Sequence, residues 1–539
     1  MTAKRVLFRS DARERILRGA TALADAVRVT LGPRSRSVLI ERKWGAPLVC
    51  NDGVTIAKEM ELKDPEENLG ARMIRQAAEK TGDAVGDGTT TSALLAHAIF
   101  AEGLRNVAAG ASAVDLKRGL ERGLTAAVAA LRALSRPVQS RKEKAQIATV
   151  SAHNEPAMGE LVADAVEKVG GTGVITVEEA KGMTSALEIV EGMSFDRGYL
   201  SPYFVTDPEK MEARLEECLL LLVEKKISVV KDILPLLEEL ARSARPLLII
   251  ADDVDAEALA TLAVNKIRGT IQCCAVKAPG FGDRRKEILE DIAVLTGGKA
   301  VMEELGIKLE HVKLAELGRA SRVVVTRDAT TIIGGHGDKA ALAGRVAQIK
   351  TQIDKTTSDY DREKLEERLA KLSGGVAVIR VGAPTETELK NRKEAFEDAI
   401  SATKAAVAEG IVPGGGLAFL RCIEPVLAAE PDCQGDERTG LRILAKALEA
   451  PTRQIAENSG AEGGVVIERM RSGQGNLGFD AARSRFVDLV EAGIIDPTKV
   501  TRLALENAVS VASVLLLTEA TLTEVAEKHD EHRATPELE

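Results

Sequence analysis

The scarcity of aromatic residues is the feature that most restricts how this chain can fold. Phe, Trp and Tyr together make up 2% of the 539 residues, whereas all hydrophobic residues make up 45%. A core without large rings has to be filled by Ala, Val, Leu and Ile, and small side chains of this kind suit helices that pack closely. The sequence therefore predicts a protein built largely on closely packed helices.

Length and charge exclude several other classes of protein. A single core stops growing beyond roughly 250–300 residues, so the chain is expected to form several domains. The 82 acidic and 73 basic residues give a formal charge of −9, and no long basic run is present, which argues against a nucleic-acid partner. The longest apolar stretches, such as 218–223, are far shorter than the roughly 18 residues that span a membrane. The first residues mix charges and lack the apolar segment of a secretory signal.

Cysteine and histidine positions indicate neither a disulfide framework nor a metal cluster. The six cysteines are spread over the whole chain, and Cys273-Cys274 does not have a metal-ligand spacing. None of the six histidines is grouped with them. We therefore expect a protein of a reducing compartment, in the cytoplasm.

Apolar periodicity divides the chain into two helical ends and a mixed middle. Helical spacing occurs at 13–29, 68–83, 89–108 and 116–134, and again from 386 onward apart from glycine-rich breaks at 410–416 and 473–478. A short strand is expected at 37–40. In the middle, short β-branched or apolar runs alternate with helical stretches at 233–243 and 256–268, which is an α/β pattern; the runs are 174–177, 187–190, 219–223, 247–250, 271–276 and 322–326. An antiparallel helical pair is expected at 339–355 and 361–372, with a capping box at Ser358.

The stretch Gly86-Asp87-Gly88-Thr89-Thr90-Thr91 carries the most chemical information. Its glycines allow close approach of a ligand, and a helix beginning at Thr89 would offer free N–H groups and a positive dipole end to phosphate. Asp87 could hold Mg²⁺. The alternative for the same local sequence is an ordinary helix N-cap after a turn, since Asp and Thr both cap helices well.

Other motifs are ambiguous when they are considered alone. Thr30–Pro33 reads as a helix stop, Asp52 as a turn residue and Asp398 as a solvated helix residue. The G-x-G-x-x-G pattern at 473–478 lacks a preceding strand, so it predicts a tight turn rather than a dinucleotide site, and no Walker A sequence is present. Four of the thirteen aromatic residues fall within 195–204, either as a small loop core or as an exposed protein-binding patch.

Taken together, these stretches resemble the group I chaperonins, the GroEL type. The resemblance rests on long motifs that run from the N-terminus to about Thr521: TLGP at 30–33, NDGVTIAKE at 51–59, GDGTTT at 86–91, VEGMSFDRGYLSPYF at 190–204, KAPGFGDRRKE at 277–287, TSDYDREKL at 357–365, GGVAVI at 374–379, GGG at 414–416 and DPTKVTR at 496–502.

The resemblance implies a multidomain α and α/β fold. A mainly helical equatorial ATPase domain would combine 1–135 and 411–525, and a small hinge domain would combine 136–190 and 377–410. The α/β apical domain would be 191–376, and 526–539 would be a disordered acidic tail.

The resemblance also assigns a nucleotide site. It implies that Asp87 holds Mg²⁺, that Thr30 and Thr90 lie near K⁺, and that Asp398, assisted by Asp52, activates the attacking water of ATP hydrolysis. The residues implied to contact ATP are Thr30, Leu31, Gly32, Pro33, Asp87, Gly88, Thr89, Thr90, Thr91, Gly415, Asp480, Ala481, Ala482 and Asp496.

The implied activity is ATP-driven protein folding. An apolar apical surface would capture non-native polypeptides, which two stacked seven-membered rings would then enclose under a GroES-type lid. That surface would comprise Tyr199, Tyr203, Phe204, Leu234, Leu237, Leu259, Ala263 and Val264. An ATP-independent holdase and a metabolic nucleotide enzyme are the alternatives.

Four departures from the family pattern are expected to adjust this activity without removing an acid needed for hydrolysis. Ala408 stands where an acid is usual, Asp480 replaces the usual Asn, and Ala263 is smaller than the usual Val. The C-terminus lacks Gly-Gly-Met repeats.

Overall fold

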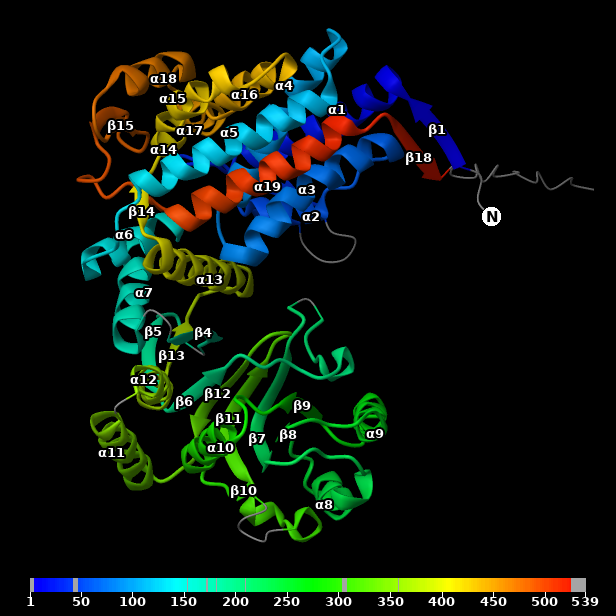
Figure 1. Ribbon diagram of the computed structural model, residues 1–539, viewed down its shortest axis with the longest axis vertical. Coiled ribbons are helices and arrows are strands. Elements are labelled where there is room, and N and C mark those ends of the chain that lie inside the picture. The colour runs from blue at the N-terminus through cyan, green and yellow to red at the C-terminus, as the bar shows by residue number, and fades with distance from the viewer. Residues whose placement is uncertain are drawn as a thin grey trace, which may run out of the picture. The chain divides into compact units, whose positions relative to one another are not determined.

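The structure is a computed structural model that describes residues 4–41, 47–152, 154–170, 173–180, 182–208, 210–302, 308–356 and 358–524 (Figure 1). It divides into two compact units, Met1–Ala163 with Glu394–Glu539 (unit 1) and Asp164–Lys393 (unit 2). Unit 1 thus contains both ends of the chain. The segments expected to form a hinge domain are shared between the units, and the finer division into three domains stays a prediction. The tail predicted at 526–539 lies outside the described residues.

Unit 1 is mainly helical. Helices α3, α4, α5 and α19 run side by side, with α1 packed on α3 and α16 packed on α5 (Figure 1). The helices of this unit are α1 (Arg9–Arg28), α2 (Gly53–Glu59), α3 (Pro65–Val85), α4 (Thr89–Ala108), α5 (Ala113–Leu134), α6 (Arg141–Ser151), α14 (Leu417–Arg421), α15 (Ile423–Ala428), α16 (Asp436–Ala447), α17 (Ala450–Asn458), α18 (Gly463–Ser472) and α19 (Thr498–Leu517). The boundary between the units falls within α7 (Pro156–Val169) and α13 (Glu386–Glu409).

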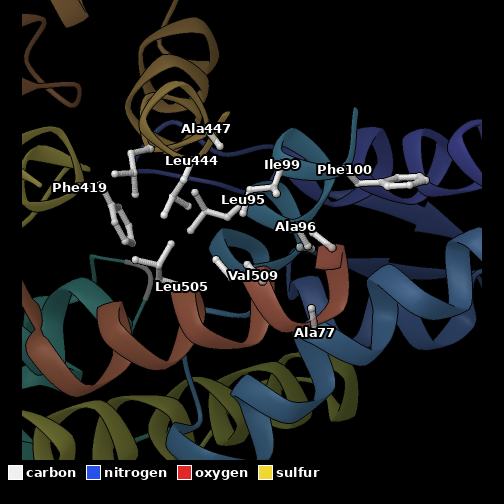
Figure 2. Close-up of a cluster of buried hydrophobic side chains, with 14 of the residues drawn as sticks. Ala77, Leu95, Ala96, Ile99, Phe100, Phe419, Leu444, Ala447, Leu505 and Val509 are labelled. Atoms are coloured by element: carbon white, nitrogen blue, oxygen red, sulfur yellow. The ribbon is translucent and has the colours of Figure 1, made fainter. Parts of the chain in front are cut away.

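The core of unit 1 confirms the expectation of small aliphatic packing. Leu95 and Ile99 of α4 meet Leu505 and Val509 of α19, with few rings among them (Figure 2). Two pairs of helices cross with their backbones in contact. A Cβ added to Gly70 of α3 would lie 2.0 Å from the carbonyl oxygen of Ile16 in α1, and Gly119 and Gly440 allow the same approach between α5 and α16.

Short two-stranded ribbons complete unit 1 and join segments far apart in sequence. Strands β1 (Lys4–Phe8) and β18 (Ala520–Glu524) pair antiparallel, with Lys4 opposite Glu524. The buried Glu66 of α3 accepts hydrogen bonds from Arg5 of β1 (Nε, 2.7 Å) and Thr523 of β18 (2.9 Å), so it ties this ribbon to the helices. The other ribbons are β2 (Val38–Ile40) with β3 (Leu48–Cys50), β14 (Ile411–Pro413) with β17 (Ile495–Pro497), and β15 (Leu477–Asp480) with β16 (Arg485–Asp488).

Unit 2 has the predicted α/β character. Its main sheet has the order β6-β12-β11-β7-β8-β9, with β10 also paired to β7, and its parallel part is built from β7-α8-β8-α9-β9. Helix α10 packs on β7 and β11. The elements are β6 (Gly192–Phe195), β7 (Ala213–Val223), α8 (Leu234–Ser243), β8 (Leu247–Ala251), α9 (Ala256–Ile267), β9 (Cys273–Lys277), α10 (Asp283–Thr296), β10 (Ala300–Val301), β11 (Gly318–Val325) and β12 (Thr330–Gly335).

A second, smaller sheet and a helical pair complete unit 2. The sheet has the order β4-β13-β5, formed by β4 (Val174–Glu179), β13 (Val376–Val381) and β5 (Ala186–Val190). Helices α11 (Lys339–Lys355) and α12 (Asp359–Ser373) form the predicted pair, and the Ser358 hydroxyl accepts from Asp361 N at 3.3 Å as an N-cap should.

Two further observations bear on the sequence predictions. All six cysteines are described and buried, and none of the six forms a disulfide. Among the described helices, α19 alone is long and apolar enough to cross a membrane, but 61% of its apolar window is buried within the protein, and its residues belong to the core of unit 1.

Candidate functional site

Unit 1 contains a cavity of about 790 Å³ whose walls come from both ends of the chain. Every residue that the family resemblance assigns to nucleotide binding or hydrolysis lines it. These residues are Thr30, Leu31, Gly32, Pro33, Asp52, Asp87, Gly88, Thr89, Thr90, Thr91, Asp398, Gly415, Asp480, Ala481, Ala482 and Asp496. Segments separated by several hundred residues thus supply the walls of one cavity.

The Gly86–Gly88 turn places the N-terminus of α4 at the cavity wall. Gly86 (φ 68°) ends α3 and Gly88 (φ 76°) precedes α4, and both are in the left-handed region that favours glycine. Side chains would also collide there, because a Cβ on Gly88 would lie 2.7 Å from Val500. The free N–H groups of the first turn of α4 and the positive end of its dipole therefore face a cavity that an anion can enter.

Threonine hydroxyls from two segments meet beside this helix end. Thr30 Oγ1 and Thr90 Oγ1 are 3.2 Å apart, and Thr30 also donates to the carbonyl of Val27 at 2.8 Å. Asp52, which reads alone as a turn residue, is the N-cap of α2 and accepts from Val54 N and Thr55 N at 3.3 and 2.7 Å. The hydroxyls of Thr30 and Thr90, the two residues implied to lie near K⁺, are therefore close enough together to coordinate one ion.

The cavity is strongly acidic. Among the described residues that line it, six side chains are acidic and two, Lys142 and Arg483, are basic. Burial, together with the charges of Asp87 and Asp52, holds the pKa of Asp398 well above its usual range. Burial and the charge of Asp87 also raise the pKa of Asp496 to about 7. Because these carboxylates oppose one another's ionisation, a bound cation would reduce the electrostatic repulsion among them.

The acidic side chains of the cavity suit Mg²⁺ better than a metal ion whose ligands all come from the protein. Among the described residues, no three His, Cys, Asp or Glu side chains are grouped closely enough to enclose a metal ion. Mg²⁺ keeps several waters and is commonly held by one or two carboxylates together with substrate phosphates. Asp87, beside the anion-attracting end of α4, is the carboxylate best placed to contribute.

Asp480 differs from Asp398 and Asp496 in its surroundings, because it is paired with Arg483 and has apolar neighbours in the cavity wall. It ends β15, only 2% of its side chain is exposed, and its oxygens accept from Arg483 N and Nη1 at 3.1 and 3.2 Å. Phe479, Ala481, Ala482 and Ile455 lie in the adjoining wall. This apolar end with one buried acceptor suits a flat heterocycle.

The predicted polypeptide-binding residues of unit 2 divide between surface and core. Tyr203, Leu234 and Val264 are exposed by 64%, 43% and 44%, whereas Tyr199 and Leu259 are partly buried. Phe204, Leu237 and Ala263 are at most 5% exposed, so their side chains belong to the interior of unit 2, and the binding role of the set stays a prediction. Of the aromatic cluster, Phe195 and Phe204 form core, as the loop-core alternative predicted, whereas Tyr203 is exposed and its binding of other proteins stays a prediction.

Comparison with known proteins adds independent information. The TCP-1/cpn60 chaperonin family matches residues 23–525. The chain belongs to this family. It is 66% identical over 538 residues to "Chaperonin GroEL 5" of Bradyrhizobium diazoefficiens, an alignment that covers 100% of this chain and 99% of that protein. This GroEL-type chaperonin therefore shares its whole length with a relative, and its role is in protein folding.

Some residues of the chaperonin's cavity carry no signal in the sequence. Ser151, at the end of α6, donates to Asp87 Oδ2 at 2.7 Å, although 64 residues separate the two. Gln146 of α6 lies against Gly493, and Ile455 of α17 against Gly32. Only the tertiary fold brings these segments together, and no local pattern distinguishes them from ordinary helix residues.

Proposed function

We propose that this chaperonin binds and hydrolyses ATP in the cavity of unit 1 and uses the cycle to fold other proteins. The proposal rests on one observation, which is that all sixteen assigned residues, from both ends of the chain, line the same cavity. The N-terminus of α4 would bind the phosphates through its backbone N–H groups, and the apolar wall near Asp480 would take the adenine.

The acidic residues would divide the chemical work. Asp87 would hold Mg²⁺, which when bound neutralises phosphate charge and makes the γ-phosphate easier to attack. Thr30 and Thr90 would contribute oxygens to K⁺. Asp398 would orient a water molecule and accept its proton, with Asp52 assisting, because the carboxylate of Asp398 lies near those of both Asp87 and Asp52 at the cavity wall.

Capture of non-native polypeptides is assigned to unit 2. Tyr203, Leu234 and Val264 would provide apolar contacts, which suit unfolded chains because such contacts need no defined sequence. We further propose a GroES-type lid, two stacked seven-membered rings and a cytoplasmic location, all by analogy with the family.

Hydrolysis by an Asp398→Ala variant tests the catalytic assignment. Nucleotide binding, measured by calorimetry, should stay within a few-fold of the wild type, while turnover falls by roughly two orders of magnitude or more, the usual contribution of a general base. Asp87→Ala is the contrasting variant, in which binding of Mg-ATP itself should weaken. Unchanged turnover in Asp398→Ala would overturn the role given to this residue.

A further inference from the structure

The carboxylate of Asp87 is held by hydrogen bonds from two different segments. Gly88 N donates to Oδ1, and Ser151 Oγ donates to Oδ2 at 2.7 Å. Gly88 is the neighbouring residue, so its bond fixes the carboxylate only relative to its own turn. Ser151 is the last residue of α6 and therefore relates the carboxylate to a separate helix.

The hydroxyl of Ser151 differs from other helical hydroxyls nearby. Thr149 of the same helix donates to Ala145 O at 2.7 Å, and Thr81 and Thr403 likewise donate to carbonyls four residues back. This return to the helix backbone is the common outcome for Ser and Thr within helices. Ser151 instead donates outward to a charged acceptor, which makes a stronger bond than one to a neutral carbonyl.

The end of α6 is well anchored, so Ser151 can fix the orientation of another group. Ala152 N donates to Ala148 O at 2.8 Å, Asn154 N donates to Thr149 O at 2.8 Å, and the side chain of Ala152 is buried. The hydroxyl is thereby presented from a fixed position.

A neutral donor suits a carboxylate that has to bind a cation. A lysine or arginine at position 151 would neutralise Asp87 and compete with a metal ion for it, whereas a hydroxyl orients the carboxylate and leaves its charge in place. A carboxylate has about four acceptor positions, and the hydrogen bonds from Ser151 and Gly88 use two of them. Asp87 also lies near the carboxylates of Asp398 and Asp496, whose repulsion would otherwise turn it away.

We propose that Ser151 is a positioning residue that holds Asp87 in the orientation required for Mg²⁺. The inference rests on the proposed function, in which Asp87 contributes to the Mg²⁺ site. Groups that orient metal ligands typically change metal affinity by about 10- to 100-fold when they are removed.

The test compares ADP binding to the full-length protein by calorimetry, first in EDTA and then across a series of Mg²⁺ concentrations. Ser151→Ala should raise, by about 10-fold or more, the Mg²⁺ concentration that produces half of the maximal change in ADP affinity. The Kd for ADP without Mg²⁺ should stay within about 2-fold of the wild-type value. Ser151→Thr, which keeps the hydroxyl, should recover most of the Mg²⁺ dependence. Thr149→Val, which removes a hydroxyl bound to its own helix, should not shift it.

Two results would overturn the inference. The first is a Ser151→Ala variant with the Mg²⁺ dependence of the wild type. The second is an equal loss of ADP affinity with and without Mg²⁺, since that would indicate a structural role for Ser151. Failure of the wild type to bind ADP under any condition is a different outcome, because it would contradict the proposed function itself.

Discussion

The crossing of α1 and α3 predicts a large effect from adding one methyl group. In Gly70→Ala the new Cβ would lie 2.0 Å from the carbonyl oxygen of Ile16, and in Gly19→Ala it would lie 1.7 Å from that of Glu67. Both obstacles are backbone atoms, so the helices have to separate by about 1 Å or more, which loses a quarter to a half of the dispersion energy across their contact. Overpacking of this kind costs about 1–3 kcal/mol or more, and the better helix propensity of Ala returns about 1 kcal/mol. Because the obstacle is backbone rather than a flexible side chain, the upper end of this range applies, and we expect the free energy of unfolding of unit 1 to fall by about 2 kcal/mol in Gly70→Ala.

Gly344 provides the matched control for this prediction. It lies within α11, and no atom outside its own helix backbone is within 4 Å of the position its Cβ would take. Gly344→Ala should therefore stabilise α11 by about 0.5–1 kcal/mol. Hydrogen exchange by mass spectrometry along a urea series reports both helices separately at one protein concentration. Equal urea midpoints for the α1 and α3 peptides of Gly70→Ala and the wild type would refute the argument that the backbones are in contact.

Three further predictions follow from individual side chains. Burial, assisted by the charge of Arg28, lowers the pKa of His97 to about 4; the unfolded chain therefore takes up a proton below pH 6.5 that the folded chain does not. The free energy of unfolding should fall by up to about 3 kcal/mol from pH 6.5 to 4. The thermal unfolding temperature of His97→Gln should depend less on pH than that of the wild type, and an equal pH dependence would contradict the prediction. The buried Asp291 of α10 is paired with Arg345 of α11 (2.7 Å) and Arg368 of α12. Asp291→Ala should therefore lower the free energy of unfolding of this region, measured in urea, by about 3–5 kcal/mol. Resistance to protease equal to that of the wild type would contradict this. Tyr203→Glu should abolish capture of a denatured test protein but spare ATP turnover and folding, because Tyr203 is 64% exposed; normal capture would remove Tyr203 from the binding surface.

Local patterns in the sequence predicted the elements whose limits are set by nearby residues. The helix expected at 89–108 is α4, because Gly88 fixes its first turn. The glycine pattern at 473–478 is the predicted turn, since the helix α18 precedes it and β15 begins at Leu477. Family motifs likewise identified the cavity residues, because those motifs contain the glycines and acids that line it.

Features that depend on contacts between distant segments could not be predicted in this way. The pairing of β1 with β18 joins residues more than 500 positions apart, and neither strand has a strong local signal. Tyr203 and Phe204 are adjacent and chemically similar, yet one is 64% exposed and the other fully buried, because the short helix Pro202–Phe204 (η1) packs against α9 and β9. The role of Ser151 is of the same kind, since it depends on where α6 ends relative to Asp87.

The most direct test of the nucleotide site is an experimental structure of the full-length protein with Mg-ADP, at a resolution that shows side chains. We expect phosphate density at the N-terminus of α4 within hydrogen-bonding distance of the backbone of Gly88–Thr91, a cation at Asp87, and the purine against the Asp480–Ala482 wall. Nucleotide bound elsewhere on the chain, with this cavity filled only by solvent, would contradict this expectation.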